Sequence, residues 1–365
     1  MMALWLHLAA TSSLLAPLPL PRPPAVSRAR QLACVAAVPD GPAEPRRFSD
    51  RPLPQAAVCL AGYLAHVLVL SRRGLRLGRL DLGLDTLAGC GVLAAAAAHR
   101  VRRGRRGVPP WLSGDTAAEE AEACACLADE APKQKLKLLA TGALLLGAPL
   151  AFSFLQPAFD AALYVLAIAL PLTEAGLLGT RLLVEQTLLY VLLCKLIQRR
   201  HPDFFGSKWV RWSLNGPWLL PVLGGYSASI ALFNLVEPLN QHMLSHLAYA
   251  PEGLVAKLAN PADKKLSSLL VASITPCIGA PIFEELQSRA FIMQALTAVM
   301  SLRKALVVSG VLFGAQHLQI GLLLPLSVTG FFWAVLYVNS QNLLVPILIH
   351  ALWNARIFLG SYLGL

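Results

Sequence analysis

The sequence predicts an all-α fold, a polytopic bundle of transmembrane helices. The 365 residues are 56% hydrophobic and only 14% charged, whereas a soluble domain carries about 25% charged residues. Long apolar runs recur along the chain. A backbone inside a bilayer must satisfy its own hydrogen bonds, and no period-2 alternation indicates a β-barrel, so helices are the expected element.

The N-terminal segment has the composition of an organelle-targeting peptide. Residues 1–39 contain no Asp or Glu, but they carry Arg22, Arg28 and Arg30 among many Ala, Pro and Ser residues. Such acid-poor, Arg-bearing segments are typical of transit peptides. A secretory signal is the rival interpretation, although its basic opening is missing, and a mitochondrial address stays open. We expect residues 1–37 to be a plastid transit peptide, and the protein to lie in a chloroplast membrane, envelope or thylakoid.

A Pro-rich linker is expected over residues 38–55, followed by a divergent region over residues 56–136. That region holds two short apolar segments, 56–70 and 82–98, and a polar stretch at 107–135 that is typical of a soluble loop. Basic residues follow both apolar segments, so one span between them would put basic loops on opposite faces, against the positive-inside tendency. We therefore expect one segment to be re-entrant or interfacial, or the region not to span.

Transmembrane and interfacial helices are expected over residues 137–264. The stretch 238–260 is amphipathic and polar, so it is expected to lie at the membrane surface. A further helix bundle is expected over residues 265–365, where the apolar density is highest and carries the most unusual polar residues. The apolar runs of these two regions lie at 137–157, 159–179, 182–197, 216–236, 267–283, 303–324, 326–339 and 341–360.

The excess of basic residues does not indicate nucleic-acid binding. The formal net charge is +11, but arginines cluster in short loops between apolar runs, at 72–79, 100–106 and 199–200. Such clusters orient membrane helices. The seven cysteines form no CxxC pair, so neither a disulfide framework nor a zinc module is indicated. The expected partners are therefore the lipid bilayer and not a nucleic acid.

Three apolar segments near the C-terminus each carry a pair of notable residues one helical turn apart, and the first segment also carries a second, adjacent glutamate. The members are, in chain order, Glu284, Glu285 and Arg289, then Phe313 and His317, then His350 and Asn354. Residues four apart share one helix face, so three helices can direct these groups at one point. A charged residue in a membrane helix costs about 2.5 to 3.5 kcal/mol on insertion scales, and such residues are functional by default.

Each pair also has a plainer interpretation when it is taken alone. Glu285 and Arg289 can be a structural ion pair that orients the site, and a single intramembrane histidine is often a hydrogen-bonded core residue. Phe313 is expected mainly to pack. A helix that restarts after Pro281 holds both glutamates in its first turn, where the helix dipole stabilises negative charge. The occurrence of all three pairs in this order indicates one shared site.

The motifs EExxxR at 284–289, FxxxH at 313–317 and HxxxN at 350–354 resemble those of the CPBP family. This family comprises CAAX proteases and bacteriocin-processing intramembrane proteases, also described as CAAX prenyl endopeptidase-like. The similarity covers about residues 265–360, and Ala290 stands where the family often has Gly. The resemblance implies an all-α membrane bundle and an intramembrane endopeptidase.

The roles implied by the resemblance agree with what peptide hydrolysis requires. Hydrolysis needs a base that activates a water and donors that stabilise the oxyanion. The resemblance implies Glu284 and His317 for the first task, and His350 and Asn354 for the second. A carboxylate in a low-dielectric cavity is well suited to act as a base near neutral pH.

Metal dependence is left open by the residues. Glu284, His317 and His350 form the His₂Glu ligand set of catalytic zinc sites, with Glu285 left as a base, although HExxH is missing. The resemblance favours a metal-free, glutamate-based mechanism with no cofactor. Asn354 fits oxyanion donation better than zinc binding.

A non-catalytic membrane scaffold or chaperone on the same fold is the main alternative function. Eroded motifs would favour it, whereas Glu284, His317, His350 and Asn354 are all present. A transporter is a third class, because intramembrane Glu and His can relay protons, but an inverted repeat is not evident. We expect a peptide or membrane-protein substrate; a prenylated CAAX protein is not expected in a plastid.

Overall fold

The computed structural model describes residues 51–71, 74–77, 80–102, 132–169, 174–244, 258–261 and 265–364. These residues form an all-α helix bundle, as predicted, together with one pair of four-residue strands. The expected transit peptide over residues 1–37 lies outside the described residues, as does most of the expected soluble loop at 107–135.

Two helices and a hairpin make up the N-terminal part. Helix α3 (Pro52–Ala65) continues into a π-helical turn, η3 (His66–Leu70), and the antiparallel strands β1 (Gly74–Leu77) and β2 (Leu80–Gly83) lead into α4 (Leu84–Arg102). The linker was expected to reach residue 55, but the helix starts at Pro52, because proline is well tolerated in the first helical turn.

The middle of the chain supplies the outer helices of one side and one central helix. The elements are α7 (Pro132–Ser153), α8 (Gln156–Ala169), α9 (Glu174–Arg200), the short 3₁₀ turns η4 (Phe204–Gly206) and η5 (Lys208–Val210), and α10 (Leu219–Leu244). Helix α10 continues through Pro238 to Leu244, so the first part of the expected interfacial stretch 238–260 is the end of this helix. Residues 245–257 lie outside the described residues.

The C-terminal part contains one long interrupted helix and three further helices. The interrupted helix runs through α12 (Leu266–Ile274), η6 (Thr275–Gly279), α13 (Ala280–Glu285), η7 (Leu286–Ile292) and α14 (Met293–Thr297). It is followed by α15 (Leu302–Ala315), the 3₁₀ turn η8 (Ile320–Leu322), α16 (Leu323–Ser340) and α17 (Leu344–Leu363). The segments η6 and η7 are π-helical.

Seven helices in the described part of the chain are long and apolar enough to cross a membrane. They cover Pro52–Leu70, Pro132–Phe152, Gly176–Arg200, Leu219–Leu244, Leu266–Thr297, Ile320–Ser340 and Leu344–Leu363. The apolar part of α4, Leu84–His99, is shorter than these spans. The chain is therefore a multi-pass membrane bundle by length and composition.

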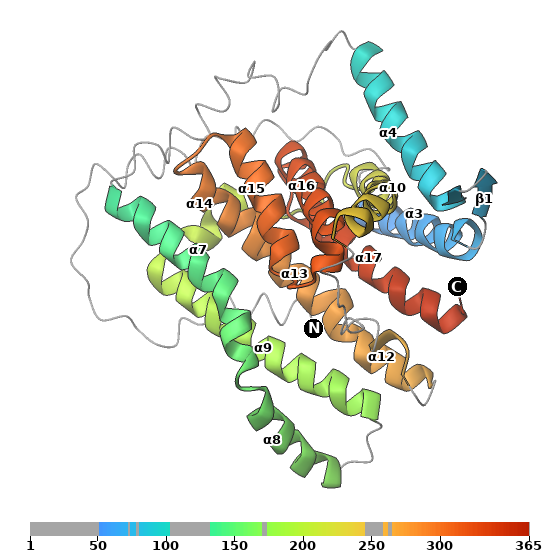
Figure 1. The fold of residues 1–365 in the computed structure, drawn as a ribbon. Coiled ribbons are helices and arrows are strands. Elements are labelled where there is room, and N and C mark those ends of the chain that lie inside the picture. The colour runs from blue at the N-terminus through green and yellow to red at the C-terminus, as the bar shows by residue number, and fades with distance from the viewer. Residues whose placement is uncertain are drawn as a thin grey trace.

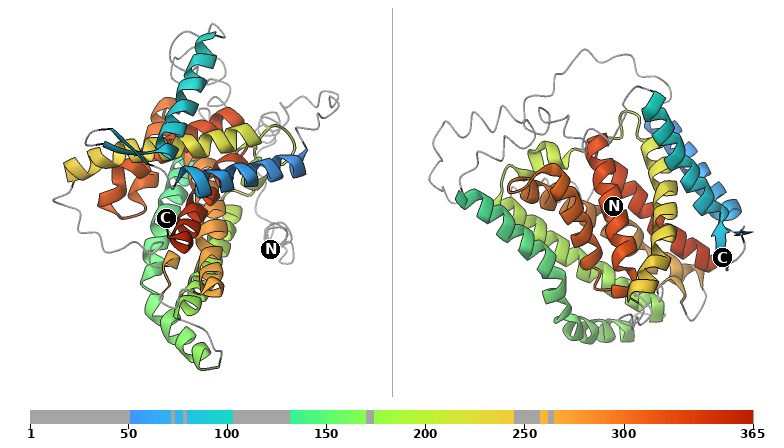
Figure 2. Two further views of the ribbon diagram at one scale, coloured as in Figure 1. Left: turned by 90° about the vertical axis from the view of Figure 1, so that its right-hand side faces the viewer. Right: turned by 45° about the horizontal axis from the view of Figure 1, so that its top comes forward.

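The C-terminal helices occupy the centre of the bundle. Helices α13 to α17 lie between α7–α9 on one side and α3–α4 on the other; α10 packs against α3, α4, α16 and α17, and Arg356 of α17 also reaches Asp85 of α4 at 2.7 Å (Figures 1 and 2). Each of the central helices therefore has neighbours on several sides, which excludes lipid from the groups between them.

Small residues allow α15 and α16 to pack closely. A Cβ atom on Gly310 would lie 2.8 Å from the backbone nitrogen of Phe331, and one on Gly314 would lie 2.8 Å from the carbonyl oxygen of Leu323. Contacts of this kind leave room for no side chain, and they are the usual way in which membrane helices approach one another. The close hairpin brings the end of α15, with His317, against the rest of the bundle.

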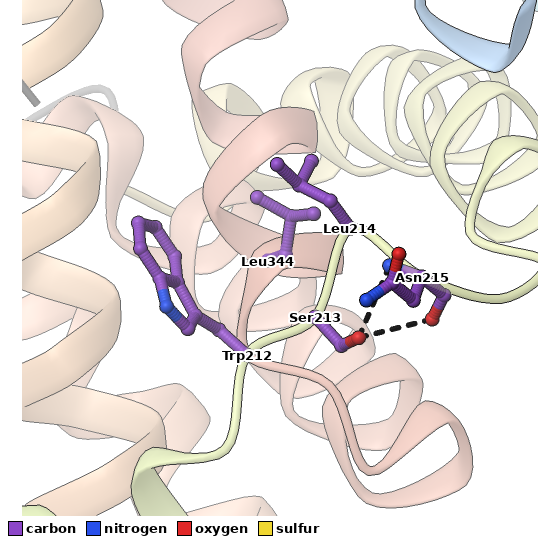
Figure 3. A pocket seen from close by; sticks show the side chains of 5 residues that line it. All are labelled: Trp212, Ser213, Leu214, Asn215 and Leu344. Carbon is purple, nitrogen blue, oxygen red and sulfur yellow. Dashed lines mark hydrogen bonds between the residues drawn. The ribbon is translucent and has the colours of Figure 1, made fainter. Parts of the chain in front are cut away.

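A small cavity opens beside the start of α17. Its volume is about 280 Å³, and Figure 3 shows the residues that line it, Trp212, Ser213, Leu214, Asn215 and Leu344. Ser213 is fixed by Asn342, which accepts from its backbone nitrogen at 2.9 Å and donates to its carbonyl oxygen at 2.9 Å. The cavity is thus a feature of the loop before α10, and His350 lies six residues, or roughly 9 Å, further along α17.

Candidate active site

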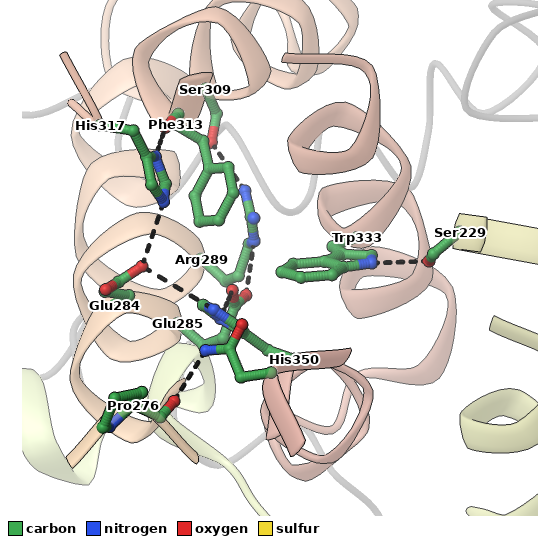
Figure 4. A network of polar contacts seen from close by, with 11 residues as sticks. Ser229, Pro276, Glu284, Glu285, Arg289, Ser309, Phe313, His317, Trp333 and His350 are labelled. Carbon is green, nitrogen blue, oxygen red and sulfur yellow. Dashed lines mark hydrogen bonds and ion pairs between the residues drawn. The ribbon is translucent and has the colours of Figure 1, made fainter. Parts of the chain in front are cut away.

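The predicted motif residues meet where α13, the end of α15 and α17 come together. Figure 4 shows the carboxylate of Glu284 between two imidazole rings. Its Oε2 atom lies 3.9 Å from Nε2 of His317 and 4.0 Å from Nε2 of His350. Three residues that are far apart in the sequence are thus brought together at one carboxylate oxygen.

A second group of ionisable residues lies beneath this contact and is completely buried. Glu285 Oε2 accepts a hydrogen bond from Arg289 Nε at 2.7 Å, and both side chains are 0% exposed. Glu285 Oε1 lies 3.2 Å from Nδ1 of His350. A buried charge is tolerated only when it is paired and hydrogen-bonded, and Glu285 meets this condition with both carboxylate oxygens.

The guanidinium of Arg289 has further partners on α15. Its Nη1 donates to Ser309 Oγ at 3.4 Å, and its carbon lies 4.8 Å from the ring centre of Phe313, a cation–π contact. Phe313 was expected mainly to pack. Its ring in fact also contacts both histidines, with centroid distances of 5.0 Å to His317 and 6.0 Å to His350.

The hydrogen-bond partners fix which ring nitrogen of each histidine carries a proton. His317 Nδ1 lies 2.7 Å from the carbonyl oxygen of Phe313, which can only accept, so this nitrogen is the donor. His350 Nδ1 faces a carboxylate oxygen of Glu285, whose other oxygen accepts from Arg289, and it is likewise the donor. Both Nε2 atoms therefore face Glu284, each with a lone pair when its ring is neutral.

When both rings are neutral, acceptors outnumber donors at Glu284. Its Oε2 atom is buried without a hydrogen-bond partner among the described residues, although the side chain as a whole is 26% exposed. Buried polar atoms normally have a partner, so three converging acceptors are suited to hold something that donates two hydrogens or carries positive charge. A water molecule and a divalent cation both meet that description.

The distances allow the two possibilities to be compared. Two ligands of a tetrahedral zinc, with bonds of about 2.0 to 2.2 Å, lie roughly 3.3 to 3.5 Å apart. A water that donates at about 2.8 Å to two acceptors holds them roughly 4 to 4.5 Å apart. The observed 3.9 and 4.0 Å fit the bridging water more closely. Within the described residues, His, Cys, Asp and Glu form no group of three or more that could hold a metal.

The π-helical segments η6 and η7 lie on either side of the Glu284–Glu285 pair. One of them, η6, also contacts Asn354. A π-helical turn is frequent at functional sites and leaves backbone groups outside the regular ladder. In η6, the carbonyl oxygen of Pro276 accepts a hydrogen bond from Asn354 Nδ2 at 2.7 Å. Asn354 therefore ties α17 to the segment that leads to the glutamates.

Sequence reasoning missed residues that support the motif side chains. The ring of Trp333 lies 4.8 Å from that of His350, and its Nε1 donates to Ser229 Oγ at 2.8 Å. Ser229 in turn donates to the carbonyl oxygen of Gly225 at 2.6 Å. Ser309 could have been found, because it precedes Phe313 by one helical turn; a lone Trp in an apolar run gives no such signal.

The comparison with protein families agrees with this geometry. Residues 266–356 match the model of the family described as type II CAAX prenyl endopeptidase Rce1-like. A search of curated proteins and a search of solved structures found no match to the chain. The matched range contains the EExxxR, FxxxH and HxxxN motifs and every contact of the polar cluster except the Trp333–Ser229 bond. Residues 266–356, the segment that carries the three motifs, are therefore similar to this family.

Proposed function

We propose that this protein is an intramembrane endopeptidase that uses Glu284 and His317 to activate a water, and His350 and Asn354 to stabilise the oxyanion. The family supports protease activity in general. The observation that carries the finer assignment is the position of Glu284 Oε2, unpartnered and within 4.0 Å of both Nε2 atoms.

The charge balance of the cluster supports a division of labour between the two histidines. Ionised Glu284 and Glu285 with cationic Arg289 would leave one uncompensated negative charge in a low-dielectric region, which is unfavourable. One extra proton removes the imbalance. We place that proton on His350, because Glu285 faces its Nδ1 at 3.2 Å and stabilises an imidazolium.

The steps of the reaction follow from this assignment. A water held between Glu284 and His317 donates one hydrogen to each, and its oxygen attacks the scissile carbonyl carbon while Glu284 accepts a proton. The carbonyl oxygen becomes an oxyanion that accepts from Nε2–H of the His350 imidazolium and from the second amide hydrogen of Asn354. The oxyanion then re-forms the carbonyl as the C–N bond breaks, and the protonated Glu284 gives its proton to the leaving amine.

A divalent metal would use the same ligands. Glu284, His317 and His350 would hold it, and it would supply Lewis-acid polarisation of a bound water. We propose the metal-free reaction because the Glu–His distances fit a bridging water more closely. The test is a cleavage assay after exhaustive chelation together with measurement of bound metal: loss of activity that zinc restores would place the reaction in the metal class.

We also propose that the protein lies in a chloroplast membrane and loses residues 1–37 on import. The support is the acid-free, Arg-bearing composition of that segment. N-terminal sequencing of the mature protein from isolated organelles should give a start near residue 38. A start at Met1 or Met2 would contradict transit processing.

Substrate trapping in isolated membranes tests the proposed function. Glu284→Ala removes the base, so an uncleaved substrate should accumulate relative to wild type and remain bound to the variant. The matched control is Ser309→Ala, which changes the same cluster without touching the water site. If no protein accumulates specifically with Glu284→Ala, the scaffold alternative gains support.

A further inference from the structure

The turn that carries His317 has an unusual backbone. Leu318, the next residue, has a φ of 54°, in the left-handed region that is unfavourable for residues other than glycine. Its side chain is 71% exposed, so it gains little by packing. A strained conformation of this kind persists only where the surroundings hold it in place.

The support on the far side of the turn comes from Asn240, a fully buried residue near the end of α10. Its Nδ2 donates to the carbonyl oxygen of Gly321 at 2.8 Å and lies 3.5 Å from that of Ile320. Its Oδ1 accepts from the backbone nitrogen of Leu324 at 3.0 Å. One amide side chain thus fixes the backbone on both sides of the junction between η8 and α16.

The contact with Leu324 replaces a missing helix cap. The first amides of a helix have no partner within the helix, and a polar N-cap side chain usually accepts from one of them. Helix α16 has Leu322 at its N-cap position and no side-chain cap of its own. Asn240 accepts from Leu324, in the first turn of α16, and so caps this helix from a different helix.

We propose that Asn240 is a positioning residue that fixes the His317 turn for catalysis. The inference rests on the proposed function, in which His317 holds the attacking water. On the α15 side, His317 is oriented by its own bond to the Phe313 carbonyl; on the α16 side, the turn depends on Asn240. Helix α10 lies outside the range matched by the family, so this control of the site comes from another part of the chain.

The chain offers a matched control on the same helix. Asn234 also lies on α10, is partly buried, and donates from Nδ2 to Thr86 Oγ1 at 2.8 Å. That bond joins α10 to α4 and does not reach the turn. Asn234→Ala therefore removes a comparable hydrogen bond while leaving the turn intact.

A rescue variant separates positioning from general stability. Glycine adopts a positive φ without steric cost, so Leu318→Gly should let the turn keep its shape without the clamp. In reconstituted full-length protein, Asn240→Ala should lower kcat by about 10- to 100-fold, since a misplacement of about 1 Å can cost that much. KM should stay within about twofold. Adding Leu318→Gly should recover several-fold of the lost kcat, and it should not raise the activity of Asn234→Ala.

Hydrogen exchange over residues 316–324 provides a readout that does not need activity. The Leu324 amide should exchange faster in Asn240→Ala than in wild type. In Asn234→Ala its exchange rate should equal that of wild type. Should Asn240→Ala fail to fold, Asn240→Ser retains one hydroxyl and takes its place. Unchanged exchange in the Asn240 variant, or an equal loss of kcat in both single variants, would overturn the inference. A wild-type protein that cleaves no peptide would instead overturn the proposed function. The hydrogen-exchange measurement does not need activity, so it tests the role of Asn240 separately.

Discussion

The polar cluster has two halves that differ in exposure and in the completeness of their contacts. In the accessible half, Glu284 and His317 have side chains that are 26% and 29% exposed and approach each other only to 3.9 Å. In the buried half, Glu285 and Arg289 are 0% exposed and joined at 2.7 Å. His350 links the halves, with Nδ1 toward Glu285 and Nε2 toward Glu284.

This difference indicates how adjacent glutamates can serve different purposes. Consecutive helical residues point about 100° apart, so Glu284 and Glu285 enter different surroundings although they are neighbours in sequence. A carboxylate whose oxygens are all paired stabilises the fold, whereas one with an unpartnered oxygen on a partly exposed side chain is available for chemistry. We therefore assign structure to the buried half and reaction to the accessible half.

The largest expected effect comes from breaking the buried half. Arg289→Gln removes the cation that pairs with Glu285 and leaves a buried carboxylate uncompensated, which can cost about 3 to 5 kcal/mol. The free energy of unfolding in detergent should fall by that order, and activity should fall with it. Lys304→Gln, an exposed lysine near the start of α15, is the control and should change stability by no more than about 0.5 kcal/mol. Equal effects of the two changes would show that the buried pair has no special role.

The next effect is expected in the accessible half and should appear in activity alone. His317→Ala removes an acceptor for the attacking water, so kcat should fall by about 100-fold or more, while the melting temperature changes little. His201→Ala is the control, because this buried histidine contacts Thr141 at 3.2 Å and lies in neither half of the cluster. It should lower stability and spare kcat. If His317→Ala clearly lowers the melting temperature and leaves kcat near the wild-type value, His317 belongs with the buried half.

A smaller effect should follow from weakening the support of Arg289. Ser309→Ala removes the hydroxyl that accepts from Nη1 at 3.4 Å, and an unsatisfied buried donor costs about 1 to 3 kcal/mol; because this bond is long, the lower end is expected. The cleavage rate should stay near that of wild type. Ser273→Ala is the control and should be nearly neutral, because the half-buried Ser273 side chain donates to the local carbonyl of Leu270 at 2.9 Å. A large loss of kcat in Ser309→Ala would mean that the halves cannot be separated.

The sequence predicted the residues of both halves and which glutamate pairs with Arg289, but not how the two halves differ in exposure. Residue type and four-residue spacing identified Glu284, Glu285, His317 and His350, because one helical turn places such residues on one face. The EExxxR spacing indicated that Arg289 pairs with Glu285, whereas the complete burial of that pair depends on packing between α13, α15 and α17.

The rest of the fold shows the same limit. Apolar runs located the main helices, since burial in lipid requires them. The hairpin β1–β2, the continuation of α10 past Pro238 and the π-helical turns of η6 and η7 were not predicted from the pattern of apolar runs. The Asn354–Pro276 bond joins segments 78 residues apart, so it could not be anticipated either.

The most direct test of the two-half account compares Glu284→Gln with Glu285→Gln in one reconstituted cleavage assay and one thermal melt. Both changes remove a charge and keep size and polarity. The account predicts that Glu284→Gln lowers kcat by about 100-fold or more with little change in melting temperature. It predicts that Glu285→Gln lowers the free energy of unfolding by about 3 kcal/mol or more, because Arg289 loses its counter-ion. Wild-type cleavage by Glu284→Gln, or equal destabilisation by the two changes, would contradict it.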